Sequence, residues 1–302
     1  MTHHSPILLF CYKRLDILKR CVASLQECPE SKFSDLIIIS DWGAKETDFP
    51  KVLAVRQFLP FITGFKSIEI IERTENLGVD FNIIEGIKEM SVRFSQFIVV
   101  EDDLKVAPDF LRFLNSSLNF YVNNTEILTV TAFSFINAIP DNYEFDAYFA
   151  KRTCPWGWAT WANKISEVDW IIEDKELFLK SRKIQRHFNE WGSDRSSMLS
   201  KTLKGEIRAW DIRLDYHQFK AGSCTLYPIH TLVDNIGFGG SDASNTFGYN
   251  RFKTKVNFSL IENLRLPESI VFNKSISRKF ILKNSIMQRI HTRVMKMMGY
   301  KN

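Results

Sequence analysis

The sequence predicts an α/β protein whose mixed, mainly parallel sheet is covered by helices on both faces. Over the first 125 residues, short apolar runs alternate with segments that carry apolar residues at helical spacing. The apolar runs are nearly continuous, which is typical of strands buried on both faces of a parallel sheet. Parallel strands need helical crossovers, so the two patterns support one another.

The elements follow in a regular order. Pro108 is expected at the first position of a further amphipathic helix that continues through Tyr121, because proline is compatible with the first helical turn. Earlier in the chain, strands are expected at 7–10, 36–39, 68–71 and 97–100, and the helices after the first three at 15–25, 52–59 and 81–90.

The second half loses this alternation. Residues 126–265 are rich in tryptophan, glycine and turn signals. We expect them to form an extension packed on the same sheet as 1–125 rather than an independent domain. Residues 266–302 form a separate tail.

Bulk composition narrows the class of protein. No apolar run reaches the roughly 20 residues that a bilayer requires. The five cysteines contain no Cys-x-x-Cys pair, which favours free thiols in a reducing compartment over a zinc site. The chain is therefore expected to be cytoplasmic. The part before the tail is mildly acidic, which argues against a nucleic-acid partner.

The tail has the opposite charge. Eight basic residues and no acidic ones follow Glu268. Apolar residues in 276–297 share one helical face, interrupted by Lys283. A basic amphipathic helix of this kind suits peripheral contact of 274–301 with an anionic membrane. Packing on the body of the protein or self-association explains the pattern about equally well.

Polar clusters follow three of the expected strands. They are 12–14, Asp41 and 101–103. In parallel α/β sheets, ligands bind beyond the carboxyl ends of the strands. The three clusters are therefore expected to meet at one edge of the sheet.

Glu101, Asp102 and Asp103 are three consecutive carboxylates after a buried strand. Their mutual repulsion costs free energy unless a cation lies beside them. Mg²⁺ and Mn²⁺ prefer oxygen ligands and need few from the protein when a diphosphate supplies others. The alternative is an acidic turn that caps the helix at Pro108.

The first loop combines an aromatic ring with two cations. The Tyr12 ring could face a nucleobase, and Lys13 and Arg14 could meet phosphates. Cations after a strand are, however, usually just solvated.

Three further polar residues follow the second and third strands. Asp41 could accept a hydrogen bond from a pyrimidine imide or cap its own turn. Arg73 and Asn76 could reach a nucleotide, although Asn76 before Leu77-Gly78 is equally typical of a turn.

Several motifs together resemble a known family. The segments FCYKR, SDWG, ENLG, VVEDDL…PDF and CPWGWATW occur in this order over residues 6–240. They resemble nucleotide-sugar glycosyltransferases of the GT-A fold, in particular bacterial surface-polysaccharide sugar transferases. These are related to the eukaryotic N-acetylglucosaminyltransferase that opens complex N-glycan branching.

The resemblance implies a UDP-sugar donor and a division of roles among the acids. Asp103 would bind Mn²⁺ or Mg²⁺, Asp102 the ribose or sugar, and Glu101 the sugar. Asp41 would contact uracil, and Tyr12 and Arg14 would lie near the nucleotide.

The resemblance also implies inversion by direct displacement, assisted by a carboxylate base. The matching segment makes Asp211 the candidate base. Relatives carry two successive acids there, whereas this chain has Ile212 in the second position. Asp194 and Asp215 are therefore alternatives.

Two aromatic and glycine-rich segments are assigned to the substrate side. Trp156, Gly157 and Trp158 could offer indole faces to a sugar, with one ring lining the site and the others buried. Residues 233–240 resemble the family's late loop, which closes near the donor. The histidine that often follows it is replaced here by 241–244, so that role is absent or belongs to Asp242.

The expected activity is transfer of a hexose or N-acetylhexosamine from a UDP-sugar to a saccharide or lipid-linked saccharide acceptor, in cell-surface polysaccharide synthesis. Residues 1–125 would bind the donor and 126–265 the acceptor. The alternatives are a sugar-nucleotide nucleotidyltransferase and a non-catalytic saccharide-binding protein. The first usually has a glycine-rich phosphate loop, and FCYKRLD contains no glycine.

Overall fold

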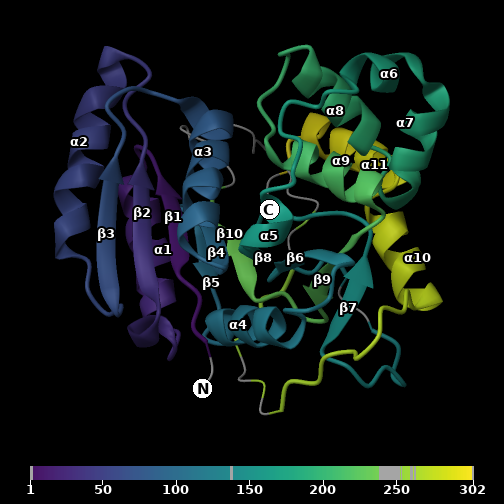
Figure 1. Ribbon diagram of the computed structural model, residues 1–302. Helices are drawn as coiled ribbons and strands as arrows, with labels where there is room; N and C mark the ends of the chain where they lie inside the picture. Colours follow the sequence, from purple (N-terminus) through teal and green to yellow (C-terminus); the bar gives the residue numbers. More distant parts are fainter. Residues whose placement is uncertain are drawn as a thin grey trace.

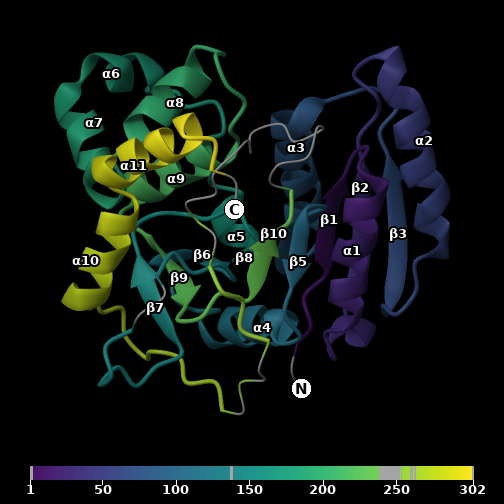
Figure 2. The same ribbon diagram turned by 180° about the vertical axis from the view of Figure 1, so that it is seen from behind.

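A computed structural model describes residues 3–136, 139–237, 252, 254–258, 261 and 263–300. An eight-stranded sheet, ordered β3-β2-β1-β4-β8-β6-β9-β7, runs through its centre, with helices in front of and behind it (Figures 1 and 2). The strands are β1 (Ile7–Cys11), β2 (Asp35–Ser40), β3 (Ser67–Glu72), β4 (Gln96–Glu101), β6 (Ile127–Thr131), β7 (Ala147–Ala150), β8 (Trp158–Trp161) and β9 (Cys224–Pro228). A smaller sheet pairs β5 (Leu104–Val106) with β10 (Val233–Asn235).

The helices of the first half are α1 (Leu15–Gln26), α2 (Phe49–Phe58), α3 (Gly78–Arg93) and α4 (Phe110–Phe120). Those of the second half are α5 (Ala162–Ile165), α6 (Lys175–Lys180), α7 (Arg182–Phe188), α8 (Arg195–Leu203) and α9 (Asp211–Ala221). The tail forms α10 (Lys274–Lys283) and α11 (Ile286–Met297).

The sheet is mixed, as the sequence predicts. Strands β3, β2, β1 and β4 pair in parallel, and they are the four expected strands. Strand β8 is antiparallel to both β4 and β6, β9 is parallel to β6, and β7 is antiparallel to β9. The strands of the second half thus continue the same sheet.

Alternate residues of β1 supply the two core layers. Ile7 and Leu9 belong to the cluster that includes buried residues of α1, α2 and α4. Leu8 and Phe10 belong to the cluster with buried residues of α3. Because every side chain of β1 is buried, its apolar run has no polar alternation.

Some details differ from the expectation. Helix α4 begins at Phe110, and Pro108 lies in the turn that precedes it rather than in its first turn. Phe81 of α3 is 66% exposed, although it was expected on the apolar face. Strand β3 is at the sheet edge, which explains why its residues are only partly buried.

All five cysteines are unpaired and buried. Among the described residues, no helix has the length and apolarity needed to cross a membrane.

Candidate active site

A cavity of about 720 Å³ lies at the carboxyl ends of β1, β2 and β4. Its volume is in the range of ~300–1,000 Å³ that is typical of small-molecule sites. All three expected polar clusters contribute to its wall, which includes Tyr12, Lys13, Arg14, Asp41, Asn76, Glu101, Asp102 and Asp103. Another hollow of similar volume, around His3, His4 and Arg93, has no such cluster of carboxylates.

The acidic triple occupies the floor of this cavity. Glu101 ends β4 opposite Phe10 of β1, and the chain then turns through Asp102 and Asp103 into β5. Arg14 donates a hydrogen bond from Nη2 to Asp102 and another, of 3.1 Å, to Oδ2 of Asp103. One guanidinium therefore faces three carboxylates.

Burial and the surplus of negative charge raise the pKa values of two of these acids. Burial, followed by repulsion from Asp103 and Asp102, raises the pKa of Glu101 well above its usual value. Burial raises the pKa of Asp102 to about 6, although Arg14 opposes the shift. The site would gain free energy from a further cation.

The same acids fit a hard divalent cation. Oδ2 of Asp102 is buried and has no hydrogen-bond partner within the described chain. No group of three or more histidine, cysteine, aspartate or glutamate side chains in that part of the chain is arranged to hold a metal alone. A metal here would therefore take most of its oxygen ligands from a bound diphosphate and water.

The loop after β1 is fixed by Asp48. The Tyr12 hydroxyl donates to Oδ2 of Asp48 at 3.0 Å and accepts from the backbone amide of Ala44 at 2.9 Å. Lys13 donates to Oδ1 of Asp48 at 2.7 Å. Lys13 is thus paired, and Arg14 is the cation of this loop that meets the acidic triple.

Asp41 caps the turn that begins α3. Its Oδ1 accepts from the amides of Trp42 and Leu77, both at 2.9 Å. Its Oδ2 accepts from Nδ2 of Asn76 at 3.0 Å and the amide of Gly78 at 2.9 Å. Each oxygen therefore has two donors within the protein. The arrangement favours the capping alternative, because a uracil imide would have to displace one of them.

Arg73 does not line the cavity. Its Nε donates to Asn82 at 3.2 Å and its Nη1 to Glu89 at 2.7 Å, both on α3. The side chain is directed along α3, and the nucleotide contact of Arg73 stays a prediction.

A second cavity, of about 340 Å³, adjoins the first and shares Arg14, Glu101 and Asp103 with it. Asp211, the first residue of α9, lies in its wall. Burial and the neighbouring Asp215 raise the pKa of Asp211 to about 6, against the effect of Arg152. A carboxylate thus faces the acidic triple across connected space.

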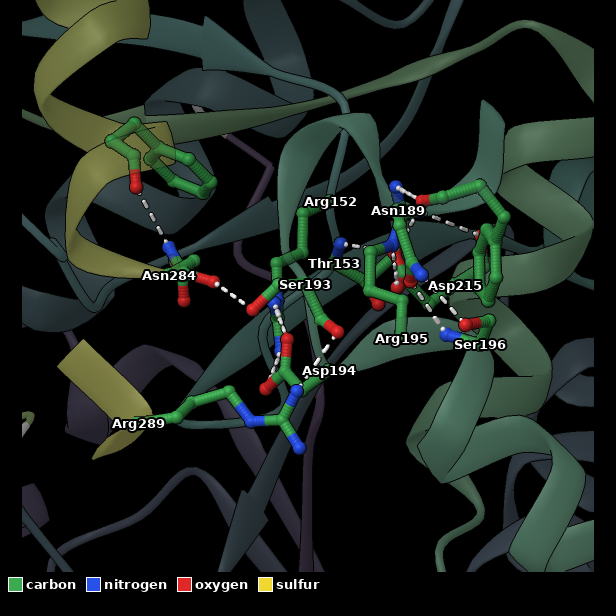
Figure 3. A network of polar contacts seen from close by, with 12 residues as sticks. Arg152, Thr153, Asn189, Ser193, Asp194, Arg195, Ser196, Asp215, Asn284 and Arg289 are labelled. Carbon is green, nitrogen blue, oxygen red and sulfur yellow. Dashed lines mark hydrogen bonds and ion pairs between the residues drawn. The ribbon is translucent and has the colours of Figure 1, made fainter. Parts of the chain in front are cut away.

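The two alternative bases are held in ion pairs (Figure 3). Asp194 accepts from both terminal nitrogens of Arg152, at 2.7 and 3.2 Å. Asp215 accepts from Arg195 at 2.6 and 2.9 Å and from the amide of Thr153 at 2.8 Å. Of the three candidates, Asp211 alone lines either of the two cavities.

The tryptophan motif divides between cavity and core. Trp156 lines the second cavity, and its ring contacts Phe133 edge-on at a centroid distance of 4.6 Å. Trp158 is 1% exposed and stacks on Trp210 at 5.7 Å. The ring of Trp158 lies in the core, so Trp156 is the ring of this motif that borders a cavity.

The backbone conformation and the neighbouring Phe110 ring explain why position 157 is a glycine. Its φ is +63°, and a Cβ there would lie 2.6 Å from Phe110. Gly157 is buried and shapes the turn into β8, and its contact with a substrate stays a prediction.

The start of the late loop lies directly on the acids. The amide of Ile236 donates to the backbone oxygen of Asp103 at 2.8 Å. A Cβ on Gly237 would lie 2.5 Å from Oδ2 of Asp103, and Asn235 lines the second cavity. Residues 238–251, including Asp242, lie outside the described part of the chain.

Arg208 is a cation that the sequence analysis missed. It lines both cavities, and its Nη1 would be 2.6 Å from a Cβ on Gly78. Its place two residues before Trp210 and three before Asp211 was the available signal. Arg14 and Arg208 are thus both in the walls of the two cavities.

No protein-family model and no curated protein matches the chain. Solved structures that resemble it in part include a mannosyltransferase from Pyrobaculum calidifontis in complex with GDP-mannose and Mn²⁺. That match has 10% identity and a TM-score of 0.30, and covers 42% of this chain and 34% of that one. Another is TarS of S. aureus, with 10% identity, a TM-score of 0.41, and coverage of 76% and 36%. The aligned part is about a third of each neighbour. At these TM-scores no argument rests on either structure.

Proposed function

We propose that this protein is a glycosyltransferase that uses a UDP-sugar, requires Mn²⁺ or Mg²⁺, and inverts the anomeric centre. One observation carries the proposal. A turn of three carboxylates and a separate carboxylate, Asp211, line two adjoining cavities at the carboxyl edge of an α/β sheet. The family resemblance of the motifs that supply these residues gives the donor and the stereochemistry.

The donor would lie in the larger cavity. Asp103 would hold the metal with help from the diphosphate, and Asp102 and Glu101 would accept hydrogen bonds from ribose and sugar hydroxyls. A bound divalent ion would supply charge stabilisation for the leaving diphosphate. Arg208, which Gly78 allows to approach the turn before α3, is placed to pair with a phosphate. Tyr12 would border the nucleoside.

Asp211 would act as the general base. It would take the proton of the acceptor hydroxyl as that oxygen bonds to the anomeric carbon and the bond to the diphosphate oxygen breaks. UDP would leave with the bonding electrons, and the proton would stay on Asp211. A pKa of about 6 leaves this carboxylate mostly ionised at neutral pH while it remains a useful proton acceptor.

The acceptor would enter the smaller cavity. Trp156 borders this cavity together with Glu101 and Asp103, and an aromatic surface there suits the C–H face of a sugar. We infer a saccharide or lipid-linked saccharide acceptor, and a place for the enzyme in cytoplasmic steps of surface-polysaccharide synthesis.

The chemistry is tested by UDP release from a panel of UDP-hexoses and UDP-N-acetylhexosamines with Mn²⁺ and mixed saccharide acceptors. The Asp211→Asn variant should lose about 10²–10⁴-fold in transfer rate while its donor affinity stays near that of the unaltered chain. Glu85→Gln, at an exposed position on α3, is the matched control and should retain full activity.

Full activity of Asp211→Asn would show that Asp211 is not the general base. Release of pyrophosphate from a nucleoside triphosphate and a sugar phosphate, instead of UDP release, would indicate a nucleotidyltransferase.

A further inference from the structure

Helix α11 is amphipathic, but its apolar side faces solvent and its mainly polar side faces the protein. Five of its apolar residues form one arc and are exposed, namely Ile286, Met287, Ile290, Val294 and Met297, at 59%, 73%, 54%, 40% and 79%. Its partly buried positions lie on the opposite side and are Arg289, Thr292 and Met295. A surface helix normally buries its apolar stripe against the core. None of the residues of α11 is fully buried.

The preceding helix shows the usual arrangement. Ile276 and Phe280 of α10 are buried in the main core. The Phe280 ring contacts those of Phe135, Tyr227 and Trp191 at centroid distances of 5.1, 5.3 and 5.7 Å. The tail is thus anchored to the body through α10, and α11 departs from the pattern within the same tail.

Polar contacts hold α11 in this orientation (Figure 3). The backbone oxygen of Asn284, just before α11, accepts from the amide of Ser193 at 3.0 Å and from its hydroxyl at 3.2 Å. Arg289 donates from Nη1 to the backbone oxygen of Ser193 at 2.9 Å. The polar side of α11 therefore faces the protein, and the apolar arc faces outward.

Helix α11 also carries exposed cations, and one of them borders the arc, since Arg293 lies one helical turn from Ile290 and from Met297. Arg293 and Lys296 are exposed and form no ion pair with another described residue. The chain contains no acidic residue after Glu268 that could neutralise them. An apolar arc on a helix whose exposed cations have no acidic partner among the described residues is complementary to a surface that is negative outside and apolar just beneath.

We propose that α11 docks on an anionic lipid surface, with its apolar arc at the boundary between headgroups and acyl chains. The described body does not cover the arc, and a second copy meeting it would bring two sets of cations together. Helix α11 lies beside α8 and α9, and α9 begins at Asp211 (Figures 1 and 2). The inference goes beyond the proposed transferase activity and does not depend on it.

Co-sedimentation of the full chain with vesicles tests the proposal. Vesicles of equal parts phosphatidylglycerol and phosphatidylcholine should bind the protein, and pure phosphatidylcholine vesicles should bind it about tenfold less or worse, since each cation near an anionic surface contributes roughly 1 kcal/mol. The double variant Ile290→Glu, Met297→Glu should lose at least about tenfold in binding.

Matched control variants distinguish the loss of the apolar arc from the effect of adding negative charge anywhere on the surface. Val92→Glu, Ile171→Glu places the same charges at exposed apolar positions elsewhere, 86% and 76% exposed, and should bind like the unaltered chain. Arg293→Gln, Lys296→Gln should weaken binding to anionic vesicles alone. A chain ending at Ser285 removes α11 but keeps Ile276 and Phe280 in the core, whereas one ending at Glu268 would not.

Equal binding by the arc variant and its control would overturn the proposal. So would a concentration-dependent dimer in sedimentation analysis that the arc variant abolishes and that binds no vesicles. Circular dichroism and thermal unfolding of each variant establish that it is folded, so a loss of binding reports on the arc itself.

Discussion

Asp211 and Asp215 lie one helical turn apart on α9 but in opposite environments. Asp215 is 3% exposed and accepts hydrogen bonds from Arg195 and the amide of Thr153. Asp211 borders a cavity, and its pKa is raised to about 6 from the usual 3.8. Folding therefore gives the Asp215 carboxylate its partners, whereas it destabilises the ionised form of Asp211.

This contrast predicts opposite effects on stability. A raised pKa means that the folded state binds the proton of Asp211 more tightly than the unfolded state does, so stability falls as pH rises from about 4 to about 6. Above that range Asp211→Asn should be more stable than the unaltered chain, by on the order of 1–3 kcal/mol. Asp215→Asn should lose about 3–5 kcal/mol, because it leaves buried Arg195 unpaired. Urea unfolding at pH 8 measures both.

The pH dependence of transfer should report the same carboxylate. A base must be ionised, so kcat/KM should rise tenfold per pH unit below about 6 and level off above it. Arg152 lowers the pKa of Asp211, so removing its charge should move this limb to higher pH. The double variant Arg152→Gln, Asp194→Asn removes that charge without leaving its partner unpaired. A limb that does not move would assign it to another group.

At the scale of elements, the turn into β8 depends on one glycine. Gly157 has φ +63°, and an added Cβ would meet the Phe110 ring of α4. Gly157→Ala should therefore lower the free energy of unfolding by about 1–4 kcal/mol, from backbone strain and overpacking together. Gly222→Ala is the matched control, since its φ is +68° and no atom lies within 4 Å of the added Cβ. Equal losses would show that the Phe110 contact contributes nothing.

The first half was predictable element by element, and the second was not. Three continuous apolar runs became the parallel strands β1, β2 and β4, because burial on both faces leaves the same pattern in the sequence and the fold. The fourth expected strand, β3, is at the sheet edge and only partly buried. Strand β8 has only four residues and lies between β4 and β6. Nothing in so short a segment predicts its neighbours. Whether Trp156 or Trp158 faces a cavity depends on that pairing, so the sequence left open which ring lines the site.

At the scale of the whole molecule, the site joins residues that are far apart in the sequence. Arg14, Glu101 and Asp103 line both cavities, and Asp211 lines the smaller one. The strand ends predicted that the first three would meet, because parallel strands share an edge. The approach of α9 to that edge depends on the fold of the second half, so Asp211 rested on the resemblance alone. Arg208 was missed for the same reason.

The central claim is that the acidic triple binds a nucleotide sugar through a divalent metal. Thermal unfolding of the full chain with UDP-sugars, with and without Mn²⁺, tests it most directly, because a ligand that binds only the native state raises the unfolding temperature. At a donor concentration about a hundred times Kd, the expected rise is roughly 4–8 °C. GDP-, dTDP- and CMP-sugars are expected to have smaller effects.

The decisive comparison uses Asp103→Ala in the same measurement. The rise produced by the UDP-sugar should require Mn²⁺ in the unaltered chain, and Asp103→Ala should abolish the difference that Mn²⁺ makes. A chain that responds to no UDP-sugar, or one whose response is the same without Mn²⁺ or with Asp103→Ala, would contradict the account.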